Sequence, residues 1–409
     1  MVQVSQHEAI ANDGFFLPPT EDSWQLNLRN DPRGKMAITI LYREELKEYD
    51  FGIEHPFRGD RFEVFPQFLR QNLAENGNYR VVRADPASDE DLRLICQQEY
   101  LDFTQGYYRA ANLGLTYPGE FFRFQSQDNL PKAQPGKTEE AARLVVGQAR
   151  AACDLIQEGK TEKAVCVGGG FHHAKPDYGE GFCIYNDVAF SARYLRYKHK
   201  LDRILILDTD AHAGNGTAEY FYADPTVLLI DLHQDPRTLY PGTGFSDQTG
   251  SGDGKGFTIN VPLPVYSGQE AYERVFEEIV QPVAEEFKPQ IVIRNGGSDP
   301  HVSDGLANLG LQVRGFRMIG EKVREVARLC DDKEIDLICS GYNREVLPYA
   351  WLALVCGVSG IDNPVQQPDS IDELERIPSW LGVDRFPTDI LAVVDDVKNH
   401  LKDYWRCFR

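Results

Sequence analysis

The apolar run Arg203–Leu207 constrains the fold of this chain more than any other segment, because residues of metal-binding type follow it at once. Asp208, Asp210 and His212 are spaced i, i+2 and i+4. In an extended strand this spacing places all three side chains on one side. Carboxylates and imidazole at the carboxyl end of a strand are how an α/β protein builds a metal site. The segment therefore predicts a buried strand that ends in a metal centre.

Strand-like and helix-like segments alternate from Ile38 onward, which is typical of an α/β protein with a mostly parallel sheet covered on both faces. The predicted strands are Met36–Tyr42, Tyr79–Arg83, Lys163–Val167, Arg203–Leu207, Thr226–Asp231, Phe257–Val261, Gln290–Arg294 and Asp336–Cys339. The predicted helices are Lys137–Glu158, Asn186–Tyr197, Gly268–Phe287, Leu311–Leu329, Asn343–Gly357 and Asp389–Trp405. Residues 107–136, 233–256 and 364–387 break the alternation and are expected to be long loops. We expect an N-terminal arm over 1–35 and one catalytic domain over 36–409, with a C-terminal extension over residues 358–409.

The composition argues against two classes of partner. With 409 residues and a formal net charge of −20, the chain lacks the excess of Lys and Arg that direct binding of nucleic acid requires. No basic region followed by an apolar stretch suggests a signal peptide, and no run of about 18 apolar residues suggests a membrane span. The eight cysteines are scattered and form no CxxC pair, which favours reduced, buried thiols in a cytoplasmic protein. A homo-oligomer stays open.

Polar residues beside glycine follow five of the predicted strands. They are His172 and His173; Asp208, Asp210 and His212; Asp231 and His233; Ser298 and Asp299; and Ser340, Gly341 and Tyr342. Ligands of open α/β sheets bind in the crevice at these carboxyl ends. One such ending could arise by chance, whereas five indicate a functional site.

Each of these residues also has a structural interpretation. Asp208, Asp210 and Asp299 could cap helices, and an isolated histidine pair is as often part of a loop. The co-location of Asp210, His212 and Asp299 nevertheless favours a metal site. For the others we expect Tyr342 taken alone to be a core-edge residue, His233 to be structural or to support the site, His55 to lie in a loop near the rim, and Glu219, Asp247 and Asp304 to face solvent or cap helices.

The ligand types indicate the chemistry. One histidine and two carboxylates suit Zn²⁺ or Fe²⁺, with positions left open for water and substrate. Histidines that are not needed as ligands can take and return a proton. A tyrosine hydroxyl facing the metal can donate a hydrogen bond to an oxyanion as it forms. Together these groups describe amide hydrolysis.

Seven motifs occur in an order and spacing that are specific to one family. They are Gly169–Ala174 (GGFHHA), Gly181–Asp187 (GFCIYND), Asp208–Gly216 (DTDAHAGNG), Tyr240–Gly244 (YPGTG), Asn260–Leu263 (NVPL), Ser298–Asp299 and Gly341–Tyr342. In these motifs, over residues 38–357, the chain resembles the histone deacetylase superfamily, which includes acetoin utilization proteins and acetylpolyamine amidohydrolases. The resemblance implies an arginase/deacetylase-like fold, with a single eight-stranded, mostly parallel sheet between helices.

The resemblance also implies roles for individual residues. It implies zinc held by Asp210, His212 and Asp299, His172 paired with Asp208, His173 paired with Asn215, and Tyr342 polarising the acyl carbonyl. Gly181, Phe182 and Tyr240 would line the tunnel for an acyl-lysine-like chain, with Leu306 at its gate. A structural potassium ion would lie beside the zinc, held by Asp208, the main chain at Asp210 and His212, Asp231 and Leu232.

The chain departs from the family pattern in four places. Ala213 replaces a second histidine after His212, and Asp231 stands where many members have serine. The glycine run before Tyr342 is shortened to Cys339-Ser340-Gly341. The carboxylate at the rim that grips the backbone of a peptide substrate is not recognisable, and Glu120 is the candidate.

We interpret the chain as a zinc-dependent deacetylase that acts on acetyl-lysine or a similar acylated amine. The alternative is a small-molecule deacylase such as an acetylpolyamine amidohydrolase, and Fe²⁺ stays open as the working metal. A ureohydrolase with two manganese ions would need further carboxylates, where this chain has Asn215-Gly216. A non-catalytic binding module would be favoured by loss of Tyr342 or of a metal ligand, and neither is lost.

Overall fold

Eight strands form one sheet in the order β2-β1-β3-β8-β7-β4-β5-β6, and every neighbouring pair is parallel. The computed structural model describes residues 38–75, 77–115, 119–365, 367–368 and 386–409, so the expected N-terminal arm lies outside the described residues. The strands are β1 (Ile38–Leu41), β2 (Tyr79–Val82), β3 (Lys163–Val167), β4 (Ile204–Asp208), β5 (Val227–Gln234), β6 (Thr258–Leu263), β7 (Ile291–Gly296) and β8 (Glu334–Ile338). The sheet is thus wholly parallel where the sequence predicts a mostly parallel one.

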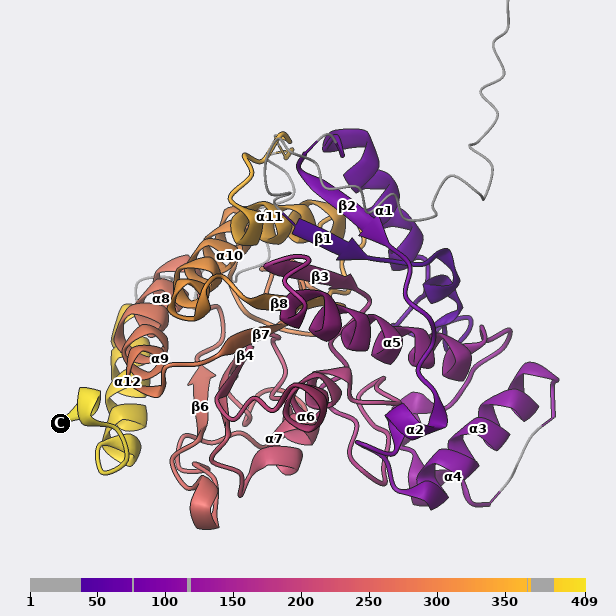
Figure 1. The fold of residues 1–409 in the computed structure, drawn as a ribbon, viewed down its shortest axis with the longest axis horizontal. Helices are drawn as coiled ribbons and strands as arrows, with labels where there is room; N and C mark the ends of the chain where they lie inside the picture. Colours follow the sequence, from indigo (N-terminus) through magenta and orange to yellow (C-terminus); the bar gives the residue numbers. More distant parts are fainter. Residues whose placement is uncertain (1–37, 76, 116–118, 366, 369–385) are drawn as a thin grey trace, which may run out of the picture. The chain divides into compact units, whose positions relative to one another are not determined.

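Helices cover both faces of the sheet (Figure 1). Helices α1, α10 and α11 lie over one face, and α5, α6 and α7 lie over the other. The helices are α1 (Arg61–Asn72), α2 (Asp89–Leu92), α3 (Gln98–Asn112), α4 (Phe121–Phe124), α5 (Thr138–Gln157), α6 (Asp187–His199), α7 (Asn215–Phe221), α8 (Gln269–Val275), α9 (Gln281–Phe287), α10 (Val313–Ala327), α11 (Leu347–Ser359) and α12 (Phe386–Leu401). A wide π turn, Phe276–Val280, joins α8 to α9. None of the helices in the described part of the chain is both long and apolar enough to cross a membrane.

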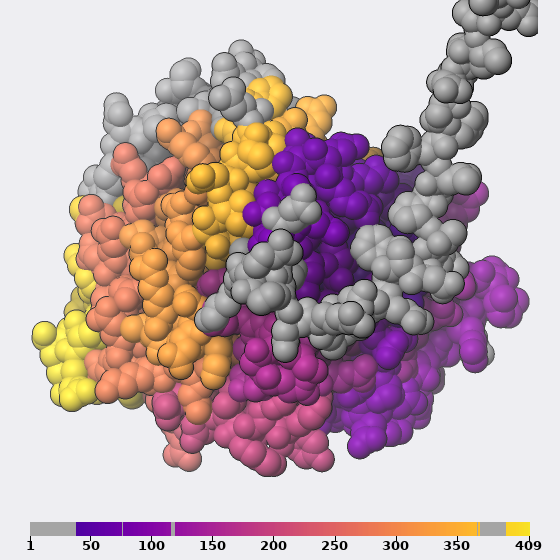
Figure 2. All heavy atoms as spheres, turned by 45° about the horizontal axis from the view of Figure 1, so that its top comes forward, coloured from indigo at the N-terminus to yellow at the C-terminus, as the bar shows by residue number. Residues whose placement is uncertain are grey.

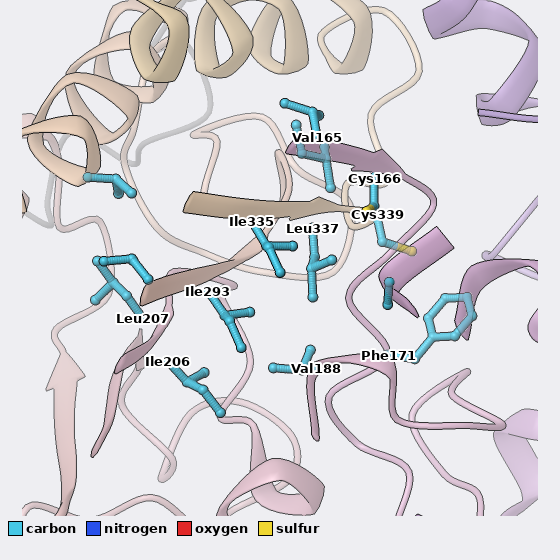
Figure 3. Packing of buried hydrophobic residues seen from close by; sticks show 14 of the residues in the cluster. Val165, Cys166, Phe171, Val188, Ile206, Leu207, Ile293, Ile335, Leu337 and Cys339 are labelled. Carbon is cyan, nitrogen blue, oxygen red and sulfur yellow. The ribbon is translucent and has the colours of Figure 1, made fainter. Parts of the chain in front are cut away.

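The strands are apolar on both faces because both faces are covered. The register pairs Ile206 of β4 with Ile293 of β7, and Ile293 with Ile335 of β8, so these side chains form a row across the sheet (Figure 3). Val188 of α6 lies on the same side of the sheet in that view, and all four residues are buried. This packing fixes the height of each strand relative to its neighbours, and with it the height of the loops at the carboxyl edge.

The prediction of a loop over residues 107–136 is wrong for two parts of that segment. Helix α3 continues to Asn112 and the short helix α4 follows. The aromatic residues of this segment pack between helices: the ring centroids of Phe103 and Phe124 lie 4.7 Å apart, and those of Tyr107 and Phe121 lie 4.6 Å apart. Aromatic residues interspersed with turn formers therefore indicate helix packing here.

The C-terminal helix α12 begins at Phe386, three residues before the predicted start, and packs against β6 and α8. Its buried residues Ile390, Val394, Val397 and Leu401 follow helical spacing, which gives the helix one apolar face. In the space-filling view the C-terminal residues lie against the segment that contains these elements (Figure 2). Most of the expected loop over residues 364–387 lies outside the described residues.

Candidate metal centre and active site

The five strand ends that carry polar residues meet at one edge of the sheet. Strands β3, β8, β7, β4 and β5 are successive neighbours in the sheet order, although they are far apart in the sequence. Because all five are parallel, the loops that follow them leave the sheet at the same edge. This edge is where the predicted catalytic and metal-binding residues contact one another.

Three side chains at this edge could hold a metal ion. Asp210, His212 and Asp299 each offer a ligand atom, and the three atoms lie within 4.8 Å of one another. The His212 Nδ1 atom lies 3.1 Å from Asp210 Oδ1 and 3.1 Å from Asp299 Oδ2. In the described part of the chain this is the one group of three such residues. The structure therefore brings together the three residues predicted to bind zinc.

The cause of this convergence differs from the one that the i, i+2, i+4 spacing suggests. Strand β4 ends at Asp208, and residues 210–212 bend away from the strand direction. Asp208 accepts the main-chain N–H of Asp210 (3.1 Å), and Asp210 accepts that of His212 (2.9 Å). A hydrogen-bonded turn, rather than one side of a strand, thus presents the two ligands. The next helix, α7, is preceded by Gly214, so neither aspartate caps it.

The electrostatics of the three residues suit a divalent cation. Burial and the neighbouring Asp210 carboxylate raise the pKa of Asp299 to about 8. Burial opposes the charge of His212, but Asp210 and Asp299 outweigh it and raise the pKa of His212 to about 10. Two buried carboxylates this close repel each other unless a positive charge lies beside them. A metal ion bound by both carboxylates and a neutral imidazole would remove that repulsion, so the donor set fits the zinc that the resemblance implies.

The adjacent histidines have opposite surroundings. His172 Nδ1 donates to Asp208 Oδ2 (2.8 Å), and although burial opposes its charge, two nearby carboxylates raise the pKa of His172 to about 9. His173 Nδ1 donates to the amide oxygen of Asn215 (2.8 Å). Burial and two neighbouring histidines lower the pKa of His173 well below its ordinary value. These surroundings favour the protonated form of His172 and the neutral form of His173.

Two residues at the start of α6 hold the turn that carries these histidines. The Asp187 carboxylate accepts the main-chain N–H of Gly170 (2.9 Å) and of Phe171 (2.7 Å). Asn186 Nδ2 donates to the carbonyl of His172 (3.2 Å). These bonds explain why the chain needs an Asn-Asp pair after the Gly-Phe-Cys segment.

A pocket of about 300 Å³ opens beside these groups. Its lining includes Asp210, His212, His172, His173 and Tyr342, and also the four predicted tunnel residues Gly181, Phe182, Tyr240 and Leu306. Gly181 adopts a φ of 60°, and a Cβ atom there would lie 2.2 Å from the His173 ring. Only glycine therefore leaves the His173 ring in its place beside the pocket.

Tyr342 enters the pocket from the loop after β8, despite the shortened glycine run. Its main-chain N–H donates to Asp304 Oδ2 (2.8 Å), and Asp304 Oδ1 accepts the N–H of Leu306 (2.8 Å). Asp304 therefore joins two pocket-lining residues, and the prediction that it faces solvent or caps a helix is wrong. Burial raises the pKa of Tyr342 well above its ordinary value, so the hydroxyl keeps its proton and can donate a hydrogen bond.

The side chains expected to hold potassium also come together. Asp208 and Asp231 are register partners on β4 and β5, and both are buried. A Cβ atom on Gly214 would lie 2.8 Å from Asp208 Oδ2 and 3.4 Å from Asp231 Oδ2, so the two carboxylates face the same small space. Asp231 Oδ1 accepts a hydrogen bond from His233 Nδ1 (2.8 Å), which places His233 in a supporting position. Leu232, the next residue of β5, is buried beside them. Carboxylate oxygens suit a hard cation such as potassium.

Besides the predicted metal ligand Asp210, the pocket lining contains the carboxylate of Asp128, which the sequence did not single out. Its Oδ2 atom accepts the main-chain N–H of Gly181 (2.8 Å). Glu120, the sequence candidate for the rim, is exposed at the start of α4 and is absent from the pocket lining. His55 lies in a loop next to two pocket-lining residues, as expected, and is buried there: its Nε2 atom lies 2.7 Å from the Asp128 carbonyl, and its ring packs edge-on against Phe182.

Two further residues, to which the sequence analysis gave no role, support the site. The Ser340 hydroxyl donates to Asp299 Oδ1 (2.6 Å), which orients a predicted metal ligand. Arg61 of α1 is buried, donates to the Cys339 carbonyl (3.1 Å) and lies with its guanidinium 5.3 Å from the Tyr342 ring centre. The replacement of a glycine by Ser340 was a signal that the sequence offered, whereas nothing local marks Arg61.

Comparisons with known proteins agree with this geometry. Residues 55–358 match the family model described as "Histone deacetylase domain". The chain is 32% identical over 383 residues to a protein of Archaeoglobus fulgidus named "Probable deacetylase", which covers 91% of this chain and 100% of that protein. It is 33% identical over 343 residues to the acetoin utilization protein AcuC of Staphylococcus aureus, which covers 83% of this chain and 85% of that protein.

Among solved structures, the HD domain of HDA15 has the same fold. It matches with a TM-score of 0.75 and 24% sequence identity, and the match covers 91% of this chain and 96% of that chain. The single parallel sheet between helices is thus the arginase/deacetylase fold. Because the family model spans most of the chain and two named relatives exceed 30% identity, the chain belongs to the histone deacetylase family.

Proposed function

We propose that the protein is a zinc-dependent deacetylase that hydrolyses the amide of acetyl-lysine or of a similar acylated amine. The observation that carries this proposal is the convergence of one metal-binding group with two histidines and Tyr342 around one pocket. Metal ligands, a proton acceptor and a hydroxyl donor are the groups that amide hydrolysis uses.

Asp210, His212 and Asp299 would hold the metal. When bound, Zn²⁺ polarises a carbonyl oxygen and lowers the pKa of water to about 7. Two carboxylates and one imidazole leave coordination positions for water and substrate. The Ser340 hydroxyl engages Asp299 Oδ1, which leaves Oδ2, the atom that faces His212, for the metal. The same donors would accept Fe²⁺.

His173 is suited to act as the general base. Its Nδ1 atom is engaged by Asn215, which leaves Nε2 as the acceptor, and its lowered pKa keeps the ring neutral. His172, cationic beside Asp208, supplies positive charge next to the reacting groups and can return a proton to the leaving amine. The two histidines differ in role because His172 pairs with a carboxylate and His173 pairs with an amide.

Tyr342 is suited to donate to the oxyanion that forms on the acyl carbonyl. Its raised pKa keeps the phenol protonated, and the bond from its N–H to Asp304 anchors the residue beside the pocket. The buried cation of Arg61 over its ring would add to the stabilisation of negative charge nearby.

The pocket walls favour an aliphatic chain with one charge. Phe182 and Tyr240 supply aromatic walls, and Leu306, which is 38% exposed, stands at the mouth. A polyamine carries further cations, and their desolvation against an apolar gate costs free energy unless a carboxylate is near. We assign to Asp128, in place of Glu120, the carboxylate that binds the backbone of a peptide substrate.

One observation favours the alternative, an acetylpolyamine or other small-molecule deacylase. Asp128 could pair with a second ammonium group instead of a peptide N–H, and the net charge of −20 attracts polycations. A ureohydrolase is disfavoured, because the described residues contain one metal-binding group of three rather than two. A non-catalytic binding role is disfavoured because Tyr342 and the three ligands are kept.

Two further features complete the proposal. Asp208, Asp231, Leu232 and the main chain at Asp210 and His212 would hold a structural potassium ion, whose charge would offset two buried carboxylates. The eight cysteines are unpaired and all but Cys407 are buried, which supports a reducing compartment such as the cytoplasm.

Asp210→Ala should strip the metal and abolish deacetylation. The substitution removes one of two anionic ligands, and the remaining carboxylate and imidazole cannot hold zinc tightly. Zinc content by atomic absorption and turnover on an acetyl-lysine peptide measure the two effects. Asp253→Ala removes an exposed carboxylate away from the pocket and serves as the control. Tight binding of one equivalent of zinc by Asp210→Ala would mean that the ligand set is wrong.

His173→Ala should reduce turnover more than His172→Ala, and both variants should keep their zinc. A general base contributes about 10²- to 10⁴-fold to rate, whereas in His172→Ala the proton taken up by His173 can itself return to the leaving amine. Single-turnover kinetics with the metal content measured in parallel separate the two variants. A larger loss for His172→Ala would reverse the assignment.

Tyr342→Phe should lower turnover about a hundredfold or more, because a phenol that donates to a developing oxyanion contributes on the order of 3 kcal/mol. Zinc content and melting temperature should not change, since only the hydroxyl is removed. Tyr349→Phe, at a tyrosine that packs against Phe68, is the matched control. Near-normal turnover in Tyr342→Phe would show that the hydroxyl points away from the acyl carbonyl.

Acetyl-lysine peptides should be better substrates than acetylspermidine for the zinc-loaded enzyme. The kcat/KM values at moderate salt decide this, and a tenfold or greater preference for acetylspermidine would favour the alternative function.

Asp128→Asn should raise KM for the peptide by about tenfold, as expected for loss of a charged hydrogen-bond acceptor. Glu120→Gln should leave KM unchanged, because Glu120 lies outside the pocket lining.

A further inference from the structure

A carboxylate lies directly behind the predicted partner of His173. Asn215 Oδ1 lies 2.8 Å from His173 Nδ1, and Asn215 Nδ2 lies 2.8 Å from Glu180 Oε1. The side chain of Glu180 is 15% exposed, and Lys175 Nζ lies 3.0 Å from the same Oε1 atom. Glu180, Asn215 and His173 therefore form one continuous chain of hydrogen bonds that ends beside the pocket.

The order of atoms in this chain has a chemical consequence. The two ends of an asparagine amide are nearly the same size, so packing alone does not decide which end faces a histidine. An ionised carboxylate can only accept hydrogen bonds. Glu180 therefore requires the NH₂ group of Asn215 on its side, and the amide oxygen must face His173.

The amide oxygen in turn decides which nitrogen of His173 carries the hydrogen. An oxygen beside Nδ1 requires an N–H there, which leaves a lone pair on Nε2. While Nδ1 of His173 contacts Asn215, Nε2 of the same ring lies 3.1 Å from Nε2 of His172. If Asn215 turned over, its NH₂ group would face Nδ1 and favour the other tautomer, in which Nε2 holds a hydrogen and cannot accept a proton.

We propose that Glu180 is a positioning residue, whose carboxylate fixes the orientation of the Asn215 amide and thereby the tautomer of His173 that can act as a base. The proposal deepens the proposed function and rests on it only for its effect on turnover. The competing explanation is that Glu180 merely forms a partly exposed ion pair with Lys175, which would contribute little.

The chain offers a matched control for that explanation. Glu219 lies 3.8 Å from the same Lys175 Nζ atom and is 51% exposed. Asn215 Nδ2 is bound to Glu180 instead. Glu219→Ala thus removes a carboxylate beside Lys175 and leaves the chain of hydrogen bonds to His173 intact.

The test combines a tautomer measurement with kinetics on the zinc-loaded, full-length protein. Glu180→Met keeps the side-chain length without an acceptor atom, and Glu180→Gln keeps an acceptor oxygen without the charge. Histidine labelled with ¹⁵N reports which ring nitrogen of His173 carries hydrogen, and the spectrum of His173→Ala assigns the resonances. Turnover and KM are measured on an acetyl-lysine peptide.

In Glu180→Met we expect His173 to become a mixture of tautomers and kcat to fall about tenfold, because the general base is affected. Glu180 also lies beside the side chain of Tyr240 at the pocket wall, so kcat rather than KM is the kinetic readout. Glu180→Gln and Glu219→Ala should keep the single tautomer and most of kcat. An unchanged tautomer in Glu180→Met overturns the proposal. An equal loss of kcat in Glu180→Gln while His173 keeps its single tautomer also overturns it, because the charge of Glu180 rather than the orientation of Asn215 would then matter. If Glu180→Met does not fold, Glu180→Ala replaces it.

The tautomer measurement does not depend on the substrate. If the wild-type protein fails to deacetylate any peptide, the proposed function fails while the ¹⁵N spectra still decide whether Glu180 orients Asn215. If the protein is active but the spectra are unaffected by Glu180→Met, the function stands and the role of Glu180 falls.

Discussion

The charges buried at the carboxyl edge of the sheet are stable only in pairs, and the site depends on this pairing. Asp208 accepts a hydrogen bond from His172, Asp231 accepts one from His233, and His212 lies between two carboxylates. An unpaired buried charge costs several kcal/mol. The His172–Asp208 and His212–Asp299 pairs each join two segments that are far apart in the sequence, so they also fix those segments relative to each other. Asp231 and His233 both belong to β5. The same hydrogen bonds therefore balance the buried charges and position the catalytic groups.

The two adjacent histidines have different roles because of a small chemical difference between their hydrogen-bond partners. His172 faces a carboxylate and His173 faces an amide, although aspartate and asparagine have almost the same shape. The fold can thus hold both rings by equivalent geometry and still shift their pKa values in opposite directions. An amide can also rotate by half a turn and exchange the positions of its oxygen and its NH₂ group, whereas the two oxygens of a carboxylate are equivalent. A chain that uses asparagine here needs another residue to restrain it, and Glu180 is within reach.

The sequence predicts the sheet and the metal ligands well because both follow from local patterns. The strand Lys163–Val167 is predicted residue for residue, since a short apolar run between polar residues marks a strand covered on both faces. The turn that presents Asp210 was not predictable from spacing, because it depends on side-chain to main-chain hydrogen bonds after the strand ends. Asp128 and Arg61 carry no motif at all. Asp128 reaches the pocket, and Arg61 reaches the Tyr342 ring, only through loops and helices from the first third of the chain, whose placement no local pattern specifies.

Helix α12 has a consequence for where this protein can be shortened. The match to the family ends at residue 358, yet the apolar face of α12 packs on β6, the last strand at that edge of the sheet, and Trp405 Nε1 donates to the Gly256 carbonyl (2.8 Å). A chain cut at the family boundary would leave β6 and the loop before it without this cover. An uncovered edge strand is a template for pairing with other chains. Truncation there would therefore cause self-association, although every residue of the pocket would be retained.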